Sequence, residues 1–278
     1  MLVGRPQNFL KLTLRIKSDE ERPILLQVYW SIPPKREPSA EEQRAHPADV
    51  LLDAVRQPET YSHVLERWLD RQDARHDARL RFSSSFAKQQ RYDIDRLIGS
   101  ANMFDIPTSS AVPPDVQVPK ELNAAKETCR KIFKQLPQSP ERDSVLAALG
   151  RVGKSSLKQK IRHRAQFLIE AVGERFPEII MVTDEAVTCR NHYVHGSAPS
   201  FDYSDNFDAV IFLTDTLEFV FAASELIEAG WDVKTWCEIG TTMSHPFARY
   251  RVNYAENLRD LKALLGADKG SGVFSRTV

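Results

Sequence analysis

The sequence is organised around the run Cys189-Arg190-Asn191-His192-Tyr193-Val194-His195-Gly196, which gathers an arginine, an amide, two imidazoles and a phenol. The residues before it, from about 183, continue a helical pattern, and Gly196 is the residue type that commonly ends a helix. Residues 206–229 downstream are apolar around most of a helical circumference. We expect that helix to be buried, either at the centre of a bundle or in a dimer seam.

The spacing of apolar residues predicts that most of the remaining chain is helical. From Ala48 onward they recur every three or four residues, as on the buried face of a helix. The charged run 71–81 is interpreted as a helix end or an exposed face. Further helices are predicted over residues 94–104, 120–135, 139–149 with Gly150 as the C-terminal cap, and 253–265. Ser155 or Ser156 could cap another helix, whose apolar stripe runs from Ile161 to Phe176.

The N-terminal residues follow a different pattern. Residues 10–16 alternate apolar and polar side chains, and residues 24–30 form a second β-rich run, which together predict a hairpin. A lone hairpin is marginally stable, so we expect it to pack on something. We divide the chain into a hairpin over 1–33, interpreted as the remnant of a β domain, a proline-rich linker over 34–47, a helical domain over 48–265 and a flexible tail over 266–278.

Composition limits the classes of partner. Lys plus Arg and Asp plus Glu both number 38, so any nucleic-acid surface must be a local patch. Three cysteines, an odd number, indicate a reducing compartment rather than a disulfide framework. No signal peptide or membrane-spanning run is recognisable, and the sequence predicts a soluble, cytoplasmic protein without a membrane partner.

One local basic patch stands out between residues 151 and 164, where six cations occur without an acid. Lys154, Lys158 and Arg162 are four residues apart, so on a helix they would share a face and repel one another. A polyanion such as RNA bound there would explain the arrangement. The alternative is that the run is a solvated helix face.

Cys189, His192 and His195 recur every third residue and raise the question of a metal. One helix can offer two such ligands, whereas a closed zinc site needs four. Glu238 or His245 could complete a set, yet no Cys-x-x-Cys or His-Glu-x-x-His signature is present. We therefore predict neither a metal site nor a cofactor.

Arg190, Asn191 and His195 form the candidate catalytic set. On a helix Asn191 and His195 lie one turn apart, while Arg190 is offset from His195 by about 140°. The long arginine side chain can bridge that offset, so all three could line one cleft. The alternative is that Arg190 caps a buried carbonyl and His195 only ends the helix near its negative pole.

Residues 190–196 resemble the ribonuclease motif of the HEPN superfamily, in which an arginine, a polar residue and a short spacer precede a histidine. More narrowly, the chain resembles the Apea-like HEPN family, whose helical segments are similar to residues 95–105 and 217–223. The similarity extends over roughly residues 49–265. Full-length members carry a large N-terminal β-rich domain, of which residues 10–30 would be the remainder.

The resemblance implies an antiparallel helical bundle that forms a homodimer, with two Arg/His sets in one cleft. It also implies a metal-independent endoribonuclease, often part of toxin or anti-phage defence systems, with RNA, tRNA included, as the partner. Catalytic roles carry over to Arg190, Asn191 and His195 alone. The alternative is a non-catalytic HEPN module that dimerises or binds nucleotide or RNA.

Overall fold

The computed structural model describes residues 1–2, 4, 12–15, 24–28, 50–88, 91–106 and 118–271, and of residues 12, 14–15 and 267–271 the backbone alone. Ten α-helices and one two-stranded sheet lie in these ranges, which confirms a mainly helical fold. The helices are α1 (Pro58–Leu69), α2 (Gln72–Phe86), α3 (Ile94–Asn102), α4 (Lys120–Gln135), α5 (Pro140–Arg151), α6 (Leu157–Val172), α7 (Ile179–His195), α8 (Phe207–Glu228), α9 (Val233–Glu238) and α10 (Pro246–Ser271).

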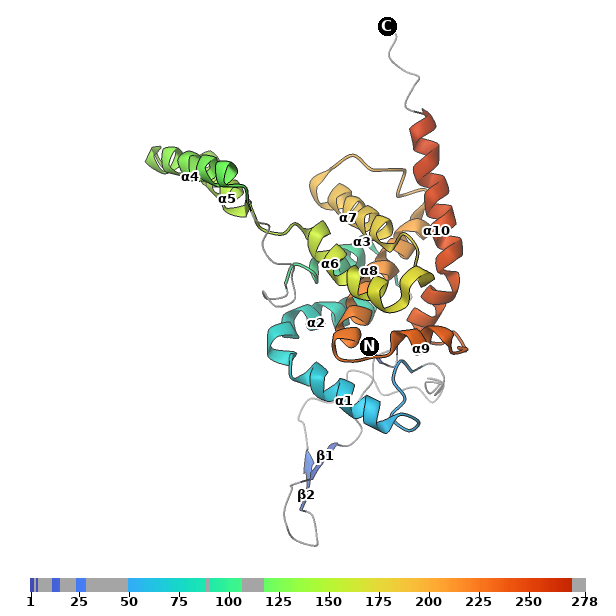
Figure 1. Cartoon of the computed structure of the whole chain (residues 1–278). Coiled ribbons are helices and arrows are strands. Elements are labelled where there is room, and N and C mark those ends of the chain that lie inside the picture. The colour runs from blue at the N-terminus through green and yellow to red at the C-terminus, as the bar shows by residue number, and fades with distance from the viewer. Residues whose placement is uncertain are drawn as a thin grey trace.

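Helix α8 is the centre of the bundle (Figure 1). It contacts α1, α2, α3, α6, α7 and α10, and it is buried along most of its length. This confirms the prediction of a buried helix over residues 206–229 and places it at the bundle centre. None of the helices in the described ranges combines the length and the apolar character needed to cross a bilayer.

A glycine lies just after the C-terminal end of both α7 and α8. Gly196 follows α7 with a φ of 66°, and its amide donates to the carbonyl of His192 at 2.9 Å. Gly230 follows α8 with a φ of 102°. Positive φ is costly for residues with a Cβ atom, so glycine at these positions fixes where each helix stops.

Beyond Asp208 in its first turn, α8 carries four carboxylates at spacings of three and seven residues: Asp215, Glu218, Glu225 and Glu228. The Glu218 carboxylate accepts from Arg96 of α3, with Nε at 2.9 Å and Nη2 at 2.8 Å. Glu225 accepts from Arg79 Nε at 3.0 Å and from Arg164 Nη2 at 3.1 Å. Buried charges need partners of opposite sign, so these pairs fix α2, α3 and α6 against α8.

Arg75 of α2 also pairs with Glu225, and its Nη2 lies 3.2 Å from Glu228 Oε2. Arg75 and Arg79 are 3% and 4% exposed. The prediction that residues 71–81 form a helix end or an exposed face is therefore wrong for Arg75 and Arg79, although most of the run, including Asp73, Asp77 and Arg81, is exposed. Charged residues on α2 face the core because α8 offers them carboxylates.

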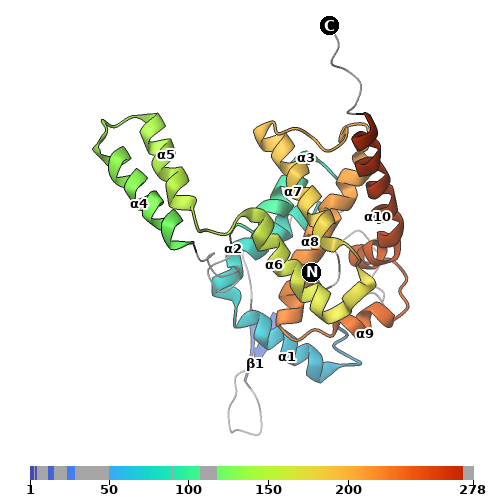
Figure 2. The ribbon, with the colours of Figure 1, turned by 45° about the horizontal axis from the view of Figure 1, so that its top comes forward.

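Helices α4 and α5 stand away from the rest of the molecule (Figure 2). The two helices pack against each other, and neither contains a buried residue. Both were predicted with nearly correct bounds. Gly150, predicted as the cap of the second helix, lies inside α5, which continues to Arg151.

Two further boundaries differ from the prediction. Residues 50–57 are not helical, and Val55 is 89% exposed; the helix begins at Pro58, which has no amide hydrogen and fits the first helical turn. The last helix is longer than residues 253–265, since α10 starts at Pro246 and reaches Ser271. Residues 272–278 of the predicted tail lie outside the described ranges.

The predicted hairpin is present as β1 (Leu12–Arg15) and β2 (Leu25–Val28), paired antiparallel with Leu14 opposite Leu26. Leu25 and Leu26 are 62% and 47% exposed, so the packing expected for this hairpin is not seen on these side chains. The predicted linker 34–47 lies outside the described residues. The domain boundaries therefore stay predictions.

We predict that Glu225→Gln lowers the free energy of unfolding by about 3–5 kcal/mol, because three buried arginines lose their shared carboxylate. Urea denaturation followed by circular dichroism measures it. Glu256→Gln on the exposed face of α10 is the control, with an expected change within about 0.5 kcal/mol. Equal stability of the two variants would contradict a structural role for the Glu225 ion pairs.

Candidate functional site

The motif residues occupy the last turns of α7, and the structure brings the three predicted side chains together. Arg190 Nη1 lies 3.0 Å from Asn191 Oδ1 and 3.0 Å from His195 Nε2. The arginine side chain thus bridges the angular offset, as expected from helix geometry. Among the described hydrogen bonds Arg190 donates to no backbone carbonyl, which is what the capping alternative would require.

A fourth side chain completes the cluster from another helix. Asn102, the last residue of α3, accepts a hydrogen bond from Arg190 Nη2 at 3.1 Å. The sequence analysis included this residue in the segment 95–105 but gave it no role, because the contact joins positions 88 residues apart. The Arg190 guanidinium is therefore hydrogen-bonded to its own helix through Nη1 and to α3 through Nη2.

The contact between Arg190 and His195 defines the form of the imidazole. A guanidinium has only donors, so His195 Nε2 must be the acceptor. The imidazole that fits this geometry is neutral, with its hydrogen on Nδ1. A neutral imidazole nitrogen can accept a proton from a reacting hydroxyl, so the cluster places a base directly beside a fixed cation.

The cluster lies at the surface of the bundle. His195 is exposed, while Arg190, Asn191 and Asn102 are half-buried. Within this set the Arg190 Nε atom is buried and has no hydrogen-bond partner among the protein atoms described. The site is thus open to a large ligand, and one donor of its arginine is unused.

The predicted RNA-binding residues lie beside the same helix, with one correction. Lys158 Nζ donates to Thr188 Oγ1 at 3.1 Å, and Arg162 Nε donates to Asp184 at 2.9 Å, so both α6 residues contact α7 before the motif. Lys154 is exposed but precedes α6, which begins at Leu157. The three cations therefore do not share a helix face.

No acid occurs within the basic run 151–164 of the sequence, but acids from other elements contact it in the structure. Lys160 Nζ lies 2.9 Å from Asp105, and Arg164 is buried against Glu225. Together with the Arg162–Asp184 pair, these contacts neutralise three of its six cations. What remains of the predicted patch is Arg151 at the end of α5, with Lys154 and Lys158 near the start of α6.

The three side chains considered as metal ligands have other environments. Cys189 is fully buried, and burial raises the pKa of its thiol to about 12. His192 Nδ1 lies 2.8 Å from the Ser197 carbonyl oxygen, and His195 faces Arg190. In the ranges that the structure describes, no three His, Cys, Asp or Glu side chains gather as a metal site would require.

A buried carboxylate fixes the loop that follows the motif. Glu185 of α7 accepts hydrogen bonds from the Tyr203 hydroxyl at 2.7 Å and from the Ser200 hydroxyl at 2.9 Å. Burial raises the pKa of Glu185, while these two hydrogen bonds act in the opposite direction. The His192 ring contacts the Tyr203 ring at a centroid distance of 5.4 Å. The loop from Gly196 is thereby held against α7.

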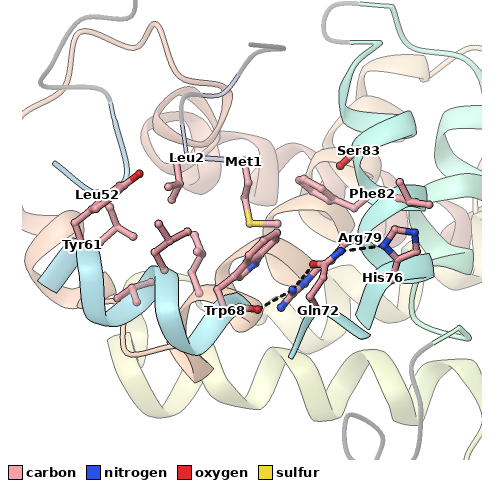
Figure 3. A pocket seen from close by; sticks show the side chains of 14 residues that line it. Met1, Leu2, Leu52, Tyr61, Trp68, Gln72, His76, Arg79, Phe82 and Ser83 are labelled. Atoms are coloured by element: carbon pink, nitrogen blue, oxygen red, sulfur yellow. Dashed lines mark hydrogen bonds between the residues drawn. The ribbon is translucent and has the colours of Figure 1, made fainter. Parts of the chain in front are cut away.

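A separate hollow of about 330 Å³ lies between α1 and α2 (Figure 3). Its polar groups are bonded to one another: Arg79 donates to Gln72 Oε1 at 2.9 Å, and Gln72 Nε2 lies 2.9 Å from His76 Nδ1. Met1 points its sulfur toward Trp68 in this view. The hollow shares no residue with the motif cluster.

Comparison with known proteins gives one family. Residues 108–235 match the family described as Apea-like HEPN, which supports the resemblance seen in the motif. The match contains residues 190–196 and 217–223 but not the segment 95–105, so it is shorter than the similarity predicted from the sequence. No curated protein and no solved structure matches the chain.

We predict that Tyr203→Phe loosens the loop after the motif, because the Glu185 carboxylate loses a buried donor. Hydrogen exchange of the Ser200 amide, which donates to the Tyr203 hydroxyl at 3.3 Å, should become at least about tenfold faster, as expected for a loss of ~1.4 kcal/mol. Tyr61→Phe is the control. Unchanged exchange in Tyr203→Phe would show that this hydroxyl does not hold the loop.

Proposed function

We propose that this chain, which carries an Apea-like HEPN segment over residues 108–235, is a metal-independent endoribonuclease that acts as a homodimer. The observation that carries the proposal is the contact between Arg190 and His195, which joins a fixed cation to a neutral base at an exposed helix end. The family as such supports the coarser statement of a nuclease-like or nucleotide-binding module.

The chemistry uses the nucleophile that RNA itself supplies, the ribose 2′-hydroxyl. His195 Nε2 takes the proton of this hydroxyl as the 2′-oxygen attacks the adjacent phosphorus. The bond from phosphorus to the 5′-oxygen breaks, a proton is delivered to that oxygen, and the upstream strand ends in a 2′,3′-cyclic phosphate. Cleavage therefore needs one base and one acid but no metal.

Arg190 would stabilise the negative charge that develops on the phosphate oxygens. Phosphate oxygens compete with His195 Nε2 for Nη1, so substrate binding itself would free the base. Asn191 accepts from Arg190 through Oδ1, which leaves its amide nitrogen able to donate to the phosphate. Each of the three side chains thus has a distinct role.

The acid is the reason for proposing a dimer. Within the described residues His192 is the other histidine of α7, but its Nδ1 lies against the Ser197 carbonyl and its ring packs on Tyr203. A second copy related by a two-fold axis would supply a second His195, which acts as the acid once the phosphate has released its Nε2 from Arg190 and that nitrogen carries a proton. The homodimer is therefore part of the proposed chemistry.

Lys158, at the side of α7 that leads to the motif, and the exposed Lys154 would hold the RNA backbone outside the reacting phosphate. Arg162 would contribute less, because Asp184 already neutralises it. The resemblance to defence ribonucleases makes tRNA and total cellular RNA the first substrates to offer, and a toxin or anti-phage role the biological setting.

We predict that the protein cleaves RNA in the presence of EDTA and that His195→Ala and Arg190→Ala each lower the rate at least about a hundredfold, the scale of a lost base or charge-stabilising donor. Gel analysis of tRNA and total RNA measures this. His163→Ala and Arg259→Ala, away from the motif, are matched controls that should keep the wild-type rate.

Light scattering of the same variants should give the mass of a dimer in each case, because neither side chain is needed for folding. Cleavage that persists in His195→Ala would refute the proposed mechanism. RNA binding without cleavage by the wild type would favour the alternative, a non-catalytic binding module.

A further inference from the structure

The acceptors around Arg190 differ in kind from those around the buried arginines that face α8. Arg75, Arg79, Arg96 and Arg164 all pair with carboxylates of α8. Arg190 is bound by two side-chain amides and an imidazole, which are neutral. The positive charge of Arg190 is thus held in place without being neutralised.

Asn102 is the one of these acceptors that comes from outside the motif helix. It also lies outside residues 108–235, so the family match assigns it no role. Its oxygen lies 3.1 Å from Arg190 Nη2, while Nη1 faces Asn191 and His195. Acceptors on both terminal nitrogens fix the plane of the guanidinium.

We propose that Asn102 is a positioning residue for Arg190, which orients the guanidinium toward an RNA phosphate while leaving its charge intact; this rests on the proposed ribonuclease function. A neutral amide oxygen can both orient the guanidinium and leave its positive charge intact. A carboxylate at the same place would bind the arginine more strongly but would also compete with the phosphate for it.

Helix α3 gives Asn102 a fixed position. Arg96 and Ser100 of the same helix both bond to Glu218 of α8, with the Ser100 hydroxyl at 3.0 Å. Leu97 and Ala101 are completely buried. Because α3 is bonded to α8 as well as packed on α7, it can hold the guanidinium against thermal motion of the exposed helix end.

Two substitutions at Asn102 distinguish a role in positioning Arg190 from a role in packing alone. Asn102→Ala removes the acceptor and should lower kcat/KM about tenfold or more, the scale of a hydrogen bond to a charged group. Asn102→Asp keeps size and acceptor but adds negative charge, so it should raise KM at least about tenfold by opposing the phosphate. If Asn102 only filled space, Asn102→Asp would behave as wild type.

Asn257→Ala and Asn257→Asp, at a half-buried asparagine of α10, are the matched controls and should leave both constants unchanged. Wild-type kcat/KM and KM in both Asn102 variants, with His195→Ala inactive, would overturn the role of Asn102 while the proposed function stands.

A second readout does not depend on activity. In nitrogen-15 NMR spectra, hindered rotation of the Arg190 guanidinium should separate its two Nη signals, identified by their loss in Arg190→Lys. Asn102→Ala should merge them, whereas Asn257→Ala should not. Identical spectra of wild type and Asn102→Ala would overturn the positioning role. If the Nη signals merge in Asn102→Ala but the wild type does not cleave RNA, the proposed ribonuclease function alone would be refuted.

Discussion

The structure depends on the carboxylates that α8 carries into the core. Glu218 and Glu225 are each 1% exposed on their side chains and could not remain charged there without arginine partners. Those partners come from α2, α3 and α6, and each partner lies at least 60 residues from its carboxylate in the sequence. The ion pairs therefore specify which helices surround α8, while the aromatic and aliphatic side chains supply most of the favourable burial.

This constraint extends to the candidate site. The Arg96–Glu218 pair fixes α3, and the last residue of α3 contacts Arg190. The Arg164–Glu225 pair fixes α6, whose Lys158 and Arg162 contact α7. The motif helix is thus placed between two helices that the α8 carboxylates hold, so the geometry of the cluster is set by the core rather than by the motif alone.

Local sequence patterns predicted most of the helices and the contacts among the motif residues. Apolar periodicity identified most helices, and the spacing of Arg190, Asn191 and His195 indicated their contact, because helix geometry is local. The core arginines and Asn102 were missed because their partners are distant in sequence. Acids within the otherwise apolar run 206–229 were a usable signal, since buried carboxylates require cations. The cap of α6 was predicted at Ser155 or Ser156, and Ser156 is the cap in the structure. Lys154 precedes this cap, so only its assignment to the same helix face as Lys158 and Arg162 was wrong.

The contrast among the arginines explains why the site lies at a helix end. The buried arginines that face α8 pair with its carboxylates, and a carboxylate would cancel the charge that a phosphate must meet. Arg251 is buried with the backbone carbonyls of Trp236 and Ile239 as acceptors, but burial closes such a cation off from a ligand. Arg190, in the last turns of α7 and beside the exposed His195, combines neutral acceptors with access, whereas an arginine earlier in the helix, beside the fully buried Ala186 and Cys189, would be out of reach of RNA. At the surface an arginine can keep its positive charge and still be held in a fixed position, and the surface is also where a polymer can bind.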